Sequence, residues 1–334
     1  MESDKVQTLP PPPGVIGSLK AGFDAIASNL PAIFLPLAID LFLWLGPRLH
    51  IDRLFQSLFD EMSQYAFQSG LPSTDILYDQ EAYAAIIQRL QQYNLFGVLR
   101  TFPIGVFSLM SGKIPNSTPY GTPAAFQIDS VFTLLFWIGL LTLLGWLAGS
   151  LFFRWVASIV ADSPRLVGMQ LGYDVLQTVL LSAIWFALAI TFGIPLLILM
   201  SLIIIASPLI ANVLLLIAGL LSMWLVVPFF FTPHGIYLQQ KNALSSIYAS
   251  FRMARFTLPT SSLFVISVLV IAYGMNYLWA IPSSESWMAL VGITGHAFIT
   301  TSLLAASFIY YRDMHVWLQT VLEKFKTNPP TGQI

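Results

Sequence analysis

The chain contains no cysteine and has few charged residues. Only 9% of its 334 residues are Asp, Glu, Lys or Arg, whereas a typical soluble domain has roughly 25%. Without cysteine there are no disulfides, no thiolate metal site and no cysteine nucleophile. The 15 Lys and Arg are balanced by 16 Asp and Glu, which leaves no basic excess to bind the phosphates of a nucleic acid. These absences exclude an ordinary soluble domain and a nucleic-acid-binding protein.

Apolar sequence is abundant instead. The chain is 56% hydrophobic and its mean hydropathy is +0.75, and a membrane-spanning helix needs about 20 predominantly apolar residues. The uncharged run from Val175 to Phe231 is long enough for two such helices and a connection. We therefore predict an all-α polytopic membrane protein with six transmembrane helices, at residues 31–49, 131–153, 175–199, 209–231, 260–279 and 287–311.

Lysine and arginine gather on one side of these predicted spans. Arg154, Lys241 and Arg252 belong to that side, whereas the short connections 201–208 and 280–286 on the other side contain neither residue type. Cytoplasmic loops carry the excess of Lys and Arg in membrane proteins. The pattern predicts a multi-pass protein of the cell inner membrane with both termini in the cytoplasm.

Segments beside the spans are amphipathic but too polar to cross a bilayer. Residues 14–30, 241–256 and 312–326 each place apolar side chains on one helical stripe. Such helices lie in the headgroup plane or pack on the cytoplasmic end of the bundle, and the sequence leaves both open. The proline-rich residues 1–13 and the tail 327–334 are expected to be disordered or solvated.

Residues 50–129 form an extracytoplasmic insertion that is too long for a plain loop. The periodicity predicts one amphipathic helix from Ile51 to Tyr65 and a second from Tyr83 to Tyr93. The apolar stretch Phe102–Met110 contains Pro and Gly and is too short to span. It is interpreted as part of a packed cap, with a re-entrant segment and a partner-docking arm as alternatives.

No catalytic or cofactor motif is present in the sequence. Gly112-Lys113 is followed by Ile114 and lacks the other residues of a phosphate-binding loop. The four histidines lie on different segments, so no group has the spacing of metal ligands. We predict no cofactor and no metal.

Two ionisable residues at membrane depth are the better functional candidates, because such groups are costly and usually have a partner or a role. Asp40 lies about nine residues from the inner end of the first span, and His296 about the same number from the outer end of the last. At 1.5 Å per residue the two fall at similar depth. They are either an ion-handling pair or separate polar groups that each satisfy backbone near Pro36 and Pro47.

Gly145 and Gly149 have the spacing that lets two helices approach closely. This spacing most often indicates packing between helices of the same bundle, and the alternative is a homodimer interface.

A resemblance rests on a set of residues around the connection after the fourth predicted span: Pro233, Gln240, Ala243, Ser250 and Arg252, after the aromatic run 229–231. This set resembles the membrane domain found with bacterial glycerophosphodiester phosphodiesterases and in related membrane proteins, although Gln240 stands where an acid is usual. The resemblance covers residues 131–311 and implies a six-helix membrane module. It does not include the soluble phosphodiesterase domain, so no catalytic residue is carried over.

The sequence thus favours a non-enzymatic membrane protein that acts as a scaffold, an accessory subunit or a lipid-organising component. Its expected partners are the lipid bilayer and either another membrane protein or a second copy of the chain. The alternative is a small transporter or permease component that uses Asp40 and His296. A membrane enzyme is the third hypothesis.

Single-cysteine variants test the predicted orientation, because the natural chain has no cysteine. In intact cells, we expect a membrane-impermeant thiol reagent to label a cysteine at Ser73 and to label one at Ser245 only after permeabilisation. Labelling at Ser245 but not at Ser73 in intact cells would refute this orientation.

Overall fold

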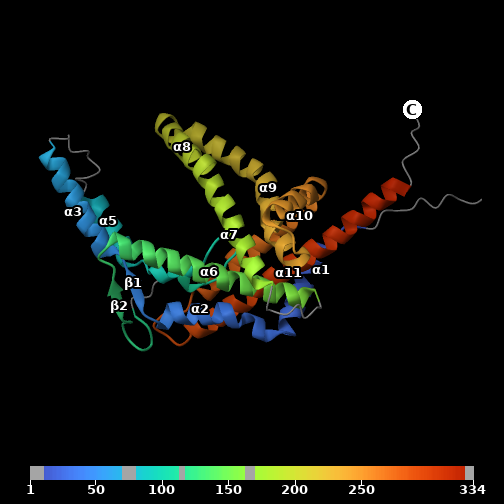
Figure 1. Cartoon of the computed structure of the whole chain (residues 1–334), viewed down its shortest axis with the longest axis horizontal. Helices are drawn as coiled ribbons and strands as arrows, with labels where there is room; N and C mark the ends of the chain where they lie inside the picture. The colour runs from blue at the N-terminus through green and yellow to red at the C-terminus, as the bar shows by residue number, and fades with distance from the viewer. Residues whose placement is uncertain (1–10, 70–79, 113–116, 162–169, 328–334) are drawn as a thin grey trace, which may run out of the picture. The chain divides into compact units, whose positions relative to one another are not determined.

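The computed structural model describes residues 11–69, 80–112, 117–161 and 170–327. The fold is all-α apart from two three-residue strands (Figure 1). The chain divides into two compact units. Unit 1 comprises Met1–Ala32, Phe153–Tyr273 and Ile299–Ile334, and unit 2 comprises Ile33–Phe152 and Gly274–Phe298.

Several helices of this structure have the length and composition of membrane spans. Within the described residues, four helices are long and apolar enough to cross a bilayer, and two bent pairs would raise the number to six. The four are Val131–Val160, Leu171–Ala206, Ala243–Trp279 and Ala289–Lys324.

Unit 1 is built around aromatic side chains from three long helices: α9 (Pro208–Gln239), α10 (Ala243–Trp279) and α11 (Ala289–Thr327). The rings of Phe264 and Tyr310 stack with their centroids 4.1 Å apart, and Phe231 stacks on Tyr310. All three side chains are fully buried. Helix α1 (Val15–Ala27) packs on α11, where a Cβ on Gly22 would lie 2.5 Å from Ala306. The close approach of these helices therefore requires glycine at this position.

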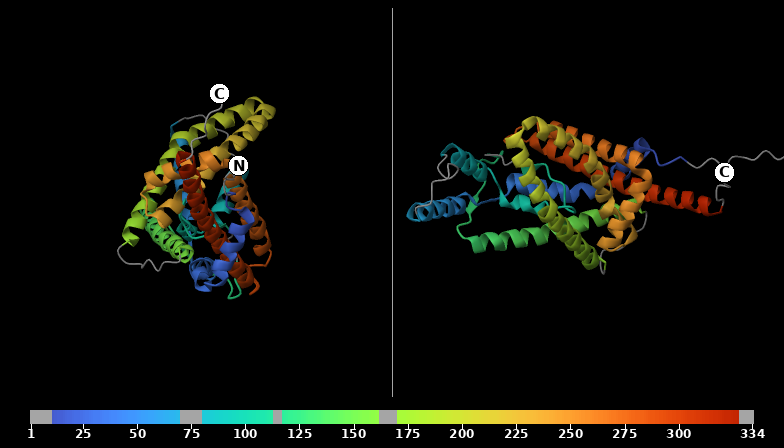
Figure 2. Two further views of the ribbon diagram at one scale, coloured as in Figure 1. Left: turned by 90° about the vertical axis from the view of Figure 1, so that its right-hand side faces the viewer. Right: turned by 90° about the horizontal axis from the view of Figure 1, so that it is seen from above.

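An apolar hairpin extends from the rest of unit 1 (Figures 1 and 2). Its first arm is α7 (Leu171–Leu188), the π-turn η4 (Ala189–Gly193) and α8 (Ile194–Ala206). Ser207 forms the turn, and α9 begins with Pro208, whose fixed φ and missing N–H suit the first helical position. In the most apolar stretch of the first arm, no residue is buried. We call α7 to the first half of α9 the apolar hairpin.

Helices α10 and α11 are longer than the spans predicted within them. Residues 241–256 and 260–279 were expected as separate helices, and so were 287–311 and 312–326, yet each pair forms one continuous helix. No Pro or Gly interrupts α11 after Gly295, and α10 accommodates Pro259 beside the hydroxyls of Thr257 and Ser261. Met314 and Leu318 are buried in the core of unit 1, so the C-terminal stripe packs within the protein.

Small polar residues form the inward face of the first half of α10. Ala243, Ser246 and Ser250 are buried, whereas Leu244 and Tyr248 of the predicted apolar stripe are each 71% exposed. The Ser246 hydroxyl donates to the carbonyl of Thr232 on α9. Interfaces between membrane helices favour small residues because lipid solvates large apolar side chains well.

Unit 2 contains α2 (Phe34–Leu45), which follows η1 (Leu30–Ile33), and the two helices α3 (Asp52–Gln68) and α5 (Gln80–Gln91). Phe59 and Tyr83 stack between α3 and α5 at 4.3 Å. Strand β1 (Arg48–His50) pairs in parallel with β2 (Ala125–Gln127). Strands of three residues are too short to give a recognisable period in the sequence. Unit 2 also contains the short turns η2 (Leu95–Leu99) and η3 (Met110–Gly112), the first part of α6 (Val131–Val160), the end of α10 and the beginning of α11.

The segment after η2 is the irregular core of unit 2. Ile104, Val106 and Leu109 are at most 6% exposed although their backbone is mostly neither helix nor strand. Gly145 and Gly149 of α6 face this segment: a Cβ would lie 2.6 Å from the Leu99 carbonyl oxygen and 2.8 Å from the Cα of Gly105, respectively. Their spacing therefore lets α6 approach an irregular segment rather than a second helix.

Three further segments lie outside the described residues, so the structure does not bear on them. They are residues 1–10, residues 70–73 and the tail beyond Thr327.

Substitution of Gly149 tests the packing of α6 on the irregular segment. Gly149→Ala would place a methyl group against the backbone of Gly105, so we expect a loss of about 1–3 kcal/mol of stability from overpacking. Gly139→Ala on the same helix is the control, because a Cβ there meets nothing within 4 Å, and it should be neutral or slightly stabilising through helix propensity. Thermal unfolding in detergent measures both variants, and an equal response would contradict the packing described.

Candidate functional site

The candidate site is centred on the carboxylate of Asp40 in unit 2. Asp40 lies in the middle of α2, and its side chain is completely buried. Pro36 is tolerated in the first turn of this helix because no intrahelical donor is needed there. Helix α2 thereby carries an ionisable group into an apolar core that includes Leu43, Trp44 and Leu109.

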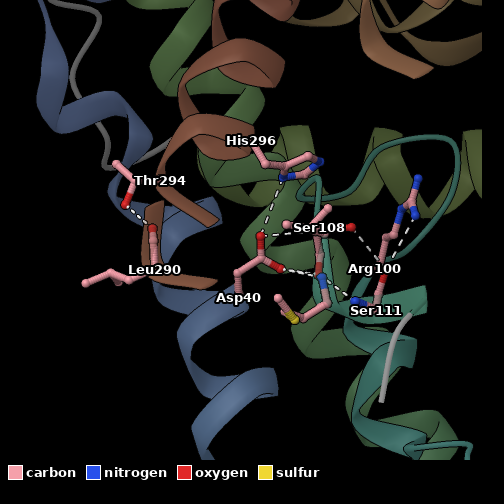
Figure 3. Close-up of polar contacts among 9 residues, drawn as sticks. Asp40, Arg100, Ser108, Ser111, Leu290, Thr294 and His296 are labelled. Atoms are coloured by element: carbon pink, nitrogen blue, oxygen red, sulfur yellow. Dashed lines mark hydrogen bonds and ion pairs between the residues drawn. The ribbon is translucent and has the colours of Figure 1, made fainter. Parts of the chain in front are cut away.

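Three donors from one turn of the irregular segment bind the carboxylate (Figure 3). The Ser108 hydroxyl donates to Oδ1 at 2.5 Å, and the backbone N–H of Met110 donates to the same oxygen at 3.0 Å. The N–H of Leu109 donates to Oδ2 at 3.0 Å. Hydrogen bonds to an ionised acceptor are roughly twice as strong as neutral ones. Asp40 therefore caps the turn that begins η3.

A second layer of contacts holds this turn in place. The Ser108 hydroxyl also accepts from the N–H of Ser111 at 3.0 Å, and the Ser111 hydroxyl donates to the Ser108 carbonyl at 3.3 Å. The Arg100 guanidinium reaches the Ser111 hydroxyl at 3.4 Å. The hydroxyl of Ser108 thus acts as donor and acceptor at once, which fixes its orientation toward Asp40.

His296 approaches the same carboxylate from α11. Its Nδ1 lies 3.5 Å from Oδ2 of Asp40, and its side chain is 8% exposed. This distance is long for a hydrogen bond, so the contact is an ion pair when the imidazole is protonated. The structure therefore brings together the two residues that the depth argument placed at the same level.

Further contacts surround α2 and the beginning of α11. The indole N–H of Trp44 donates to the carbonyl of Ser284, in the connection before α11, at 2.8 Å. Trp44 also packs in one core with Ala289 and Ile293 of α11. At the end of α10, the Trp279 ring lies where a Cβ on Gly295 would come within 2.7 Å of it. Within unit 2, α2 therefore packs on the helix that carries His296.

Most of the hydrogen-bonding capacity of the carboxylate is used by the protein itself. A carboxylate offers about four lone-pair sites; Ser108, Leu109 and Met110 donate to three of them, and His296 faces Oδ2 at 3.5 Å. No group of three His, Asp or Glu side chains in the described part of the chain is arranged to hold a metal ion. The chemistry supported here is structural: the carboxylate organises a turn.

The partners of Asp40 from the irregular segment were not anticipated. They follow Asp40 by about 70 residues in a stretch without helical or strand period, and two of them are backbone groups that carry no sequence signal. The polar side chain of Asn276, on the last part of α10, is exposed. Thr300 and Thr301 are buried in unit 1.

A second buried charge pair, in unit 1, was also missed. The Arg154 guanidinium donates to the carboxylate of Asp174 on α7, and it contacts the amide oxygen of Gln170 at 2.9 Å. Gln240 donates to the same oxygen at 2.9 Å. A signal was present, since Asp174 directly precedes the long uncharged run and a carboxylate at that border needs a partner.

No protein-family model, curated protein or solved structure matches this chain. The resemblance of residues 131–311 to a phosphodiesterase-associated membrane domain stays a prediction.

A double-mutant cycle separates the two roles of Asp40. Asp40→Asn replaces one accepting oxygen with an NH2 group, which cannot accept from the donors of the turn, so we expect a loss of about 1–3 kcal/mol. His296→Gln removes the 3.5 Å contact with Asp40, which is weaker than the hydrogen bonds of the turn, and should cost less. The double variant should lose less than the sum, because the two side chains are in contact. Thermal unfolding in detergent measures all three.

A larger loss from His296→Gln than from Asp40→Asn would contradict the structural role of the carboxylate. Ser108→Ala is the matched control, because it removes one donor and leaves the charge in place.

Proposed function

We propose that this chain is a non-enzymatic multi-pass integral membrane protein that serves as a scaffold, an accessory subunit or a lipid-organising component of a membrane assembly. In this proposal it crosses the inner membrane six times with both termini in the cytoplasm. The bilayer is its first partner, and another membrane protein or a second copy of the chain is the other.

The observation that carries the proposal is the uncovered surface of the apolar hairpin. Leu197 is 69% exposed, Ile205 82% and Leu216 67%, and the most apolar stretch of the first arm has no buried residue. Soluble monomers rarely expose contiguous apolar patches larger than a few hundred Å². Lipid tails or apolar helices of a partner are the two environments that suit such a surface.

The hairpin is also long enough for this role. Its first arm has 36 residues, or about 54 Å at 1.5 Å per residue, against a hydrocarbon core of about 30 Å. Tilting accommodates the excess. The part of this arm formed by η4 and α8 has no buried residue, and an apolar surface of this kind suits assembly or lipid contact.

The hydrogen bonds of Asp40 also favour a structural role over transport. A transport site has to exchange its ligand, whereas this carboxylate is bound by three donors from one turn and faces His296. The alternative, a small transporter or permease component, is favoured by the 3.5 Å approach of His296 to Asp40. In that proposal the pair would have to release the turn before it could bind an ion.

Cysteine accessibility in native membranes tests the proposed environment of the hairpin. We expect cysteines at Leu197 and Leu216 to resist a hydrophilic maleimide in permeabilised membranes, because lipid or partner helices cover them, and to react after denaturation. A cysteine at the exposed Ser245 is the control and should react in permeabilised membranes. A photo-crosslinker on the same two cysteines should give adducts with lipid or with another chain.

Labelling of the two hairpin cysteines as fast as Ser245 would contradict the proposal. Cross-links confined to the same chain would also contradict it, because the hairpin would then be covered by the protein itself.

A further inference from the structure

Two adjoining cavities in unit 1 follow α10 where it packs beside α9 and α11. Their volumes are about 690 and 360 Å³, and Tyr248 and Arg252 line both. We call them together the basic groove. The larger part is walled by apolar side chains, among them Trp224, Leu225 and Phe256, and the smaller part by Lys241, Ser245 and Gln319.

Three cations line the basic groove without a carboxylate to balance them. Lys241, Arg252 and Arg255 form no ion pair with any residue that the structure describes. The sequence has no Asp or Glu between Asp174 and Glu285, so α9 and α10 contain none.

His315 of α11 also lines the groove. The acidic residue nearest to it in sequence is Asp313, which forms an ion pair with Arg312 at 2.9 Å. Burial, followed by the positive charge of Arg252, lowers the pKa of Lys241. The groove therefore concentrates positive charge, and no carboxylate is among the described residues that line it.

The apolar part of the groove is open to its surroundings. Trp224 is 58% exposed, Phe256 55% and Tyr248 71%. Because Tyr248 and Arg252 belong to both cavities, the cationic part continues directly into the apolar part. A ligand that fills both must carry a negative charge at one end and an apolar body at the other.

We infer that the basic groove binds an anionic phospholipid, with the phosphate headgroup near Lys241, Arg252 and Arg255 and an acyl chain along Trp224 and Phe256. This inference rests on the proposed membrane function. Basic pockets between membrane helices on the cytoplasmic side are suited to phosphate headgroups, and the charge pattern predicts that side for these three residues. A free phosphate would use the cations but would leave the apolar part empty.

Native mass spectrometry of the detergent-purified full chain tests the inference. We expect phosphatidylglycerol to bind at least fivefold more tightly than phosphatidylcholine, since each nearby cation contributes about a fivefold gain at an anionic surface. The double variant Arg252→Gln/Arg255→Gln should weaken phosphatidylglycerol binding roughly 25-fold by the same arithmetic. Arg53→Gln/Arg89→Gln is the matched control, because it removes two exposed cations of unit 2 and should leave binding unchanged.

A second variant keeps the test valid if the Arg double variant fails to fold. Trp224→Ala shortens the apolar wall and leaves all three cations in place. It should weaken phosphatidylglycerol binding while leaving any binding of inorganic phosphate alone unchanged.

Each adverse outcome has a distinct meaning. Equal affinity for the two lipids, or equal weakening by the control variant, would overturn the lipid site. Binding of inorganic phosphate as tight as that of phosphatidylglycerol would show a free-anion site, and capture of an acidic protein that lipid does not displace would show a docking site for protein.

If the groove binds phosphatidylglycerol selectively while the hairpin cysteines are exposed to water, the proposed function fails and the lipid site stands. If the hairpin cysteines are covered and the two lipids bind with equal affinity, the lipid site fails and the proposed function stands.

Discussion

Buried backbone that belongs to no helix or sheet must find hydrogen-bond partners elsewhere, and in unit 2 the carboxylate of Asp40 supplies them. The turn at Ser108 to Met110 lies in the core, where an unpaired N–H costs about 1–3 kcal/mol. The same burial would be unfavourable for Asp40 without donors. The same hydrogen bonds therefore offset both costs of burial. The carboxylate accepts from the N–H groups of the turn, and these donors replace the water that the carboxylate has lost.

The packing around this turn in unit 2 is consistent with its attachment to Asp40. Once the turn is fixed, Ile104 and Val106 are held in the core, and Gly145 and Gly149 let α6 lie directly on the segment. A larger side chain at either glycine would separate the helix from backbone that has no regular structure of its own. In unit 1 short hydroxyl side chains instead make polar contacts between helices: Ser246 donates to the carbonyl of Thr232, and the Ser307 hydroxyl contacts the ring of His234.

The sequence was informative about helices and depth and uninformative about which faces turn inward. Apolar runs near 20 residues long locate the helices because length and composition are properties of a single segment. Counting residues along the two helices placed Asp40 and His296 at a similar depth in the membrane. In the structure, Nδ1 of His296 lies 3.5 Å from Oδ2 of Asp40. The choice of Ser108 as partner depends on a contact across 68 positions of the chain, and no local period encodes it.

The inward face of α10 differs from the apolar stripe that its sequence predicts. In water, the stripe with Leu244 and Tyr248 would be expected to pack inward, yet both side chains are exposed and Ser246 and Ser250 are buried. Where lipid tails are the solvent, large apolar side chains gain little from burial, and close approach of backbones decides the packing. Small residues then face the protein, and the apolar stripe is left for whatever surrounds it.

This division of faces connects two surfaces of unit 1, the apolar hairpin and the basic groove. The hairpin is uncharged along its most apolar stretch, whereas the basic groove combines apolar walls with cations that no carboxylate of the described residues pairs with. Acyl chains suit the first surface, and an anionic headgroup with its acyl chain suits the second. The proposed membrane environment would account for both surfaces, and the hydrogen bonds of Asp40 hold the protein's own backbone.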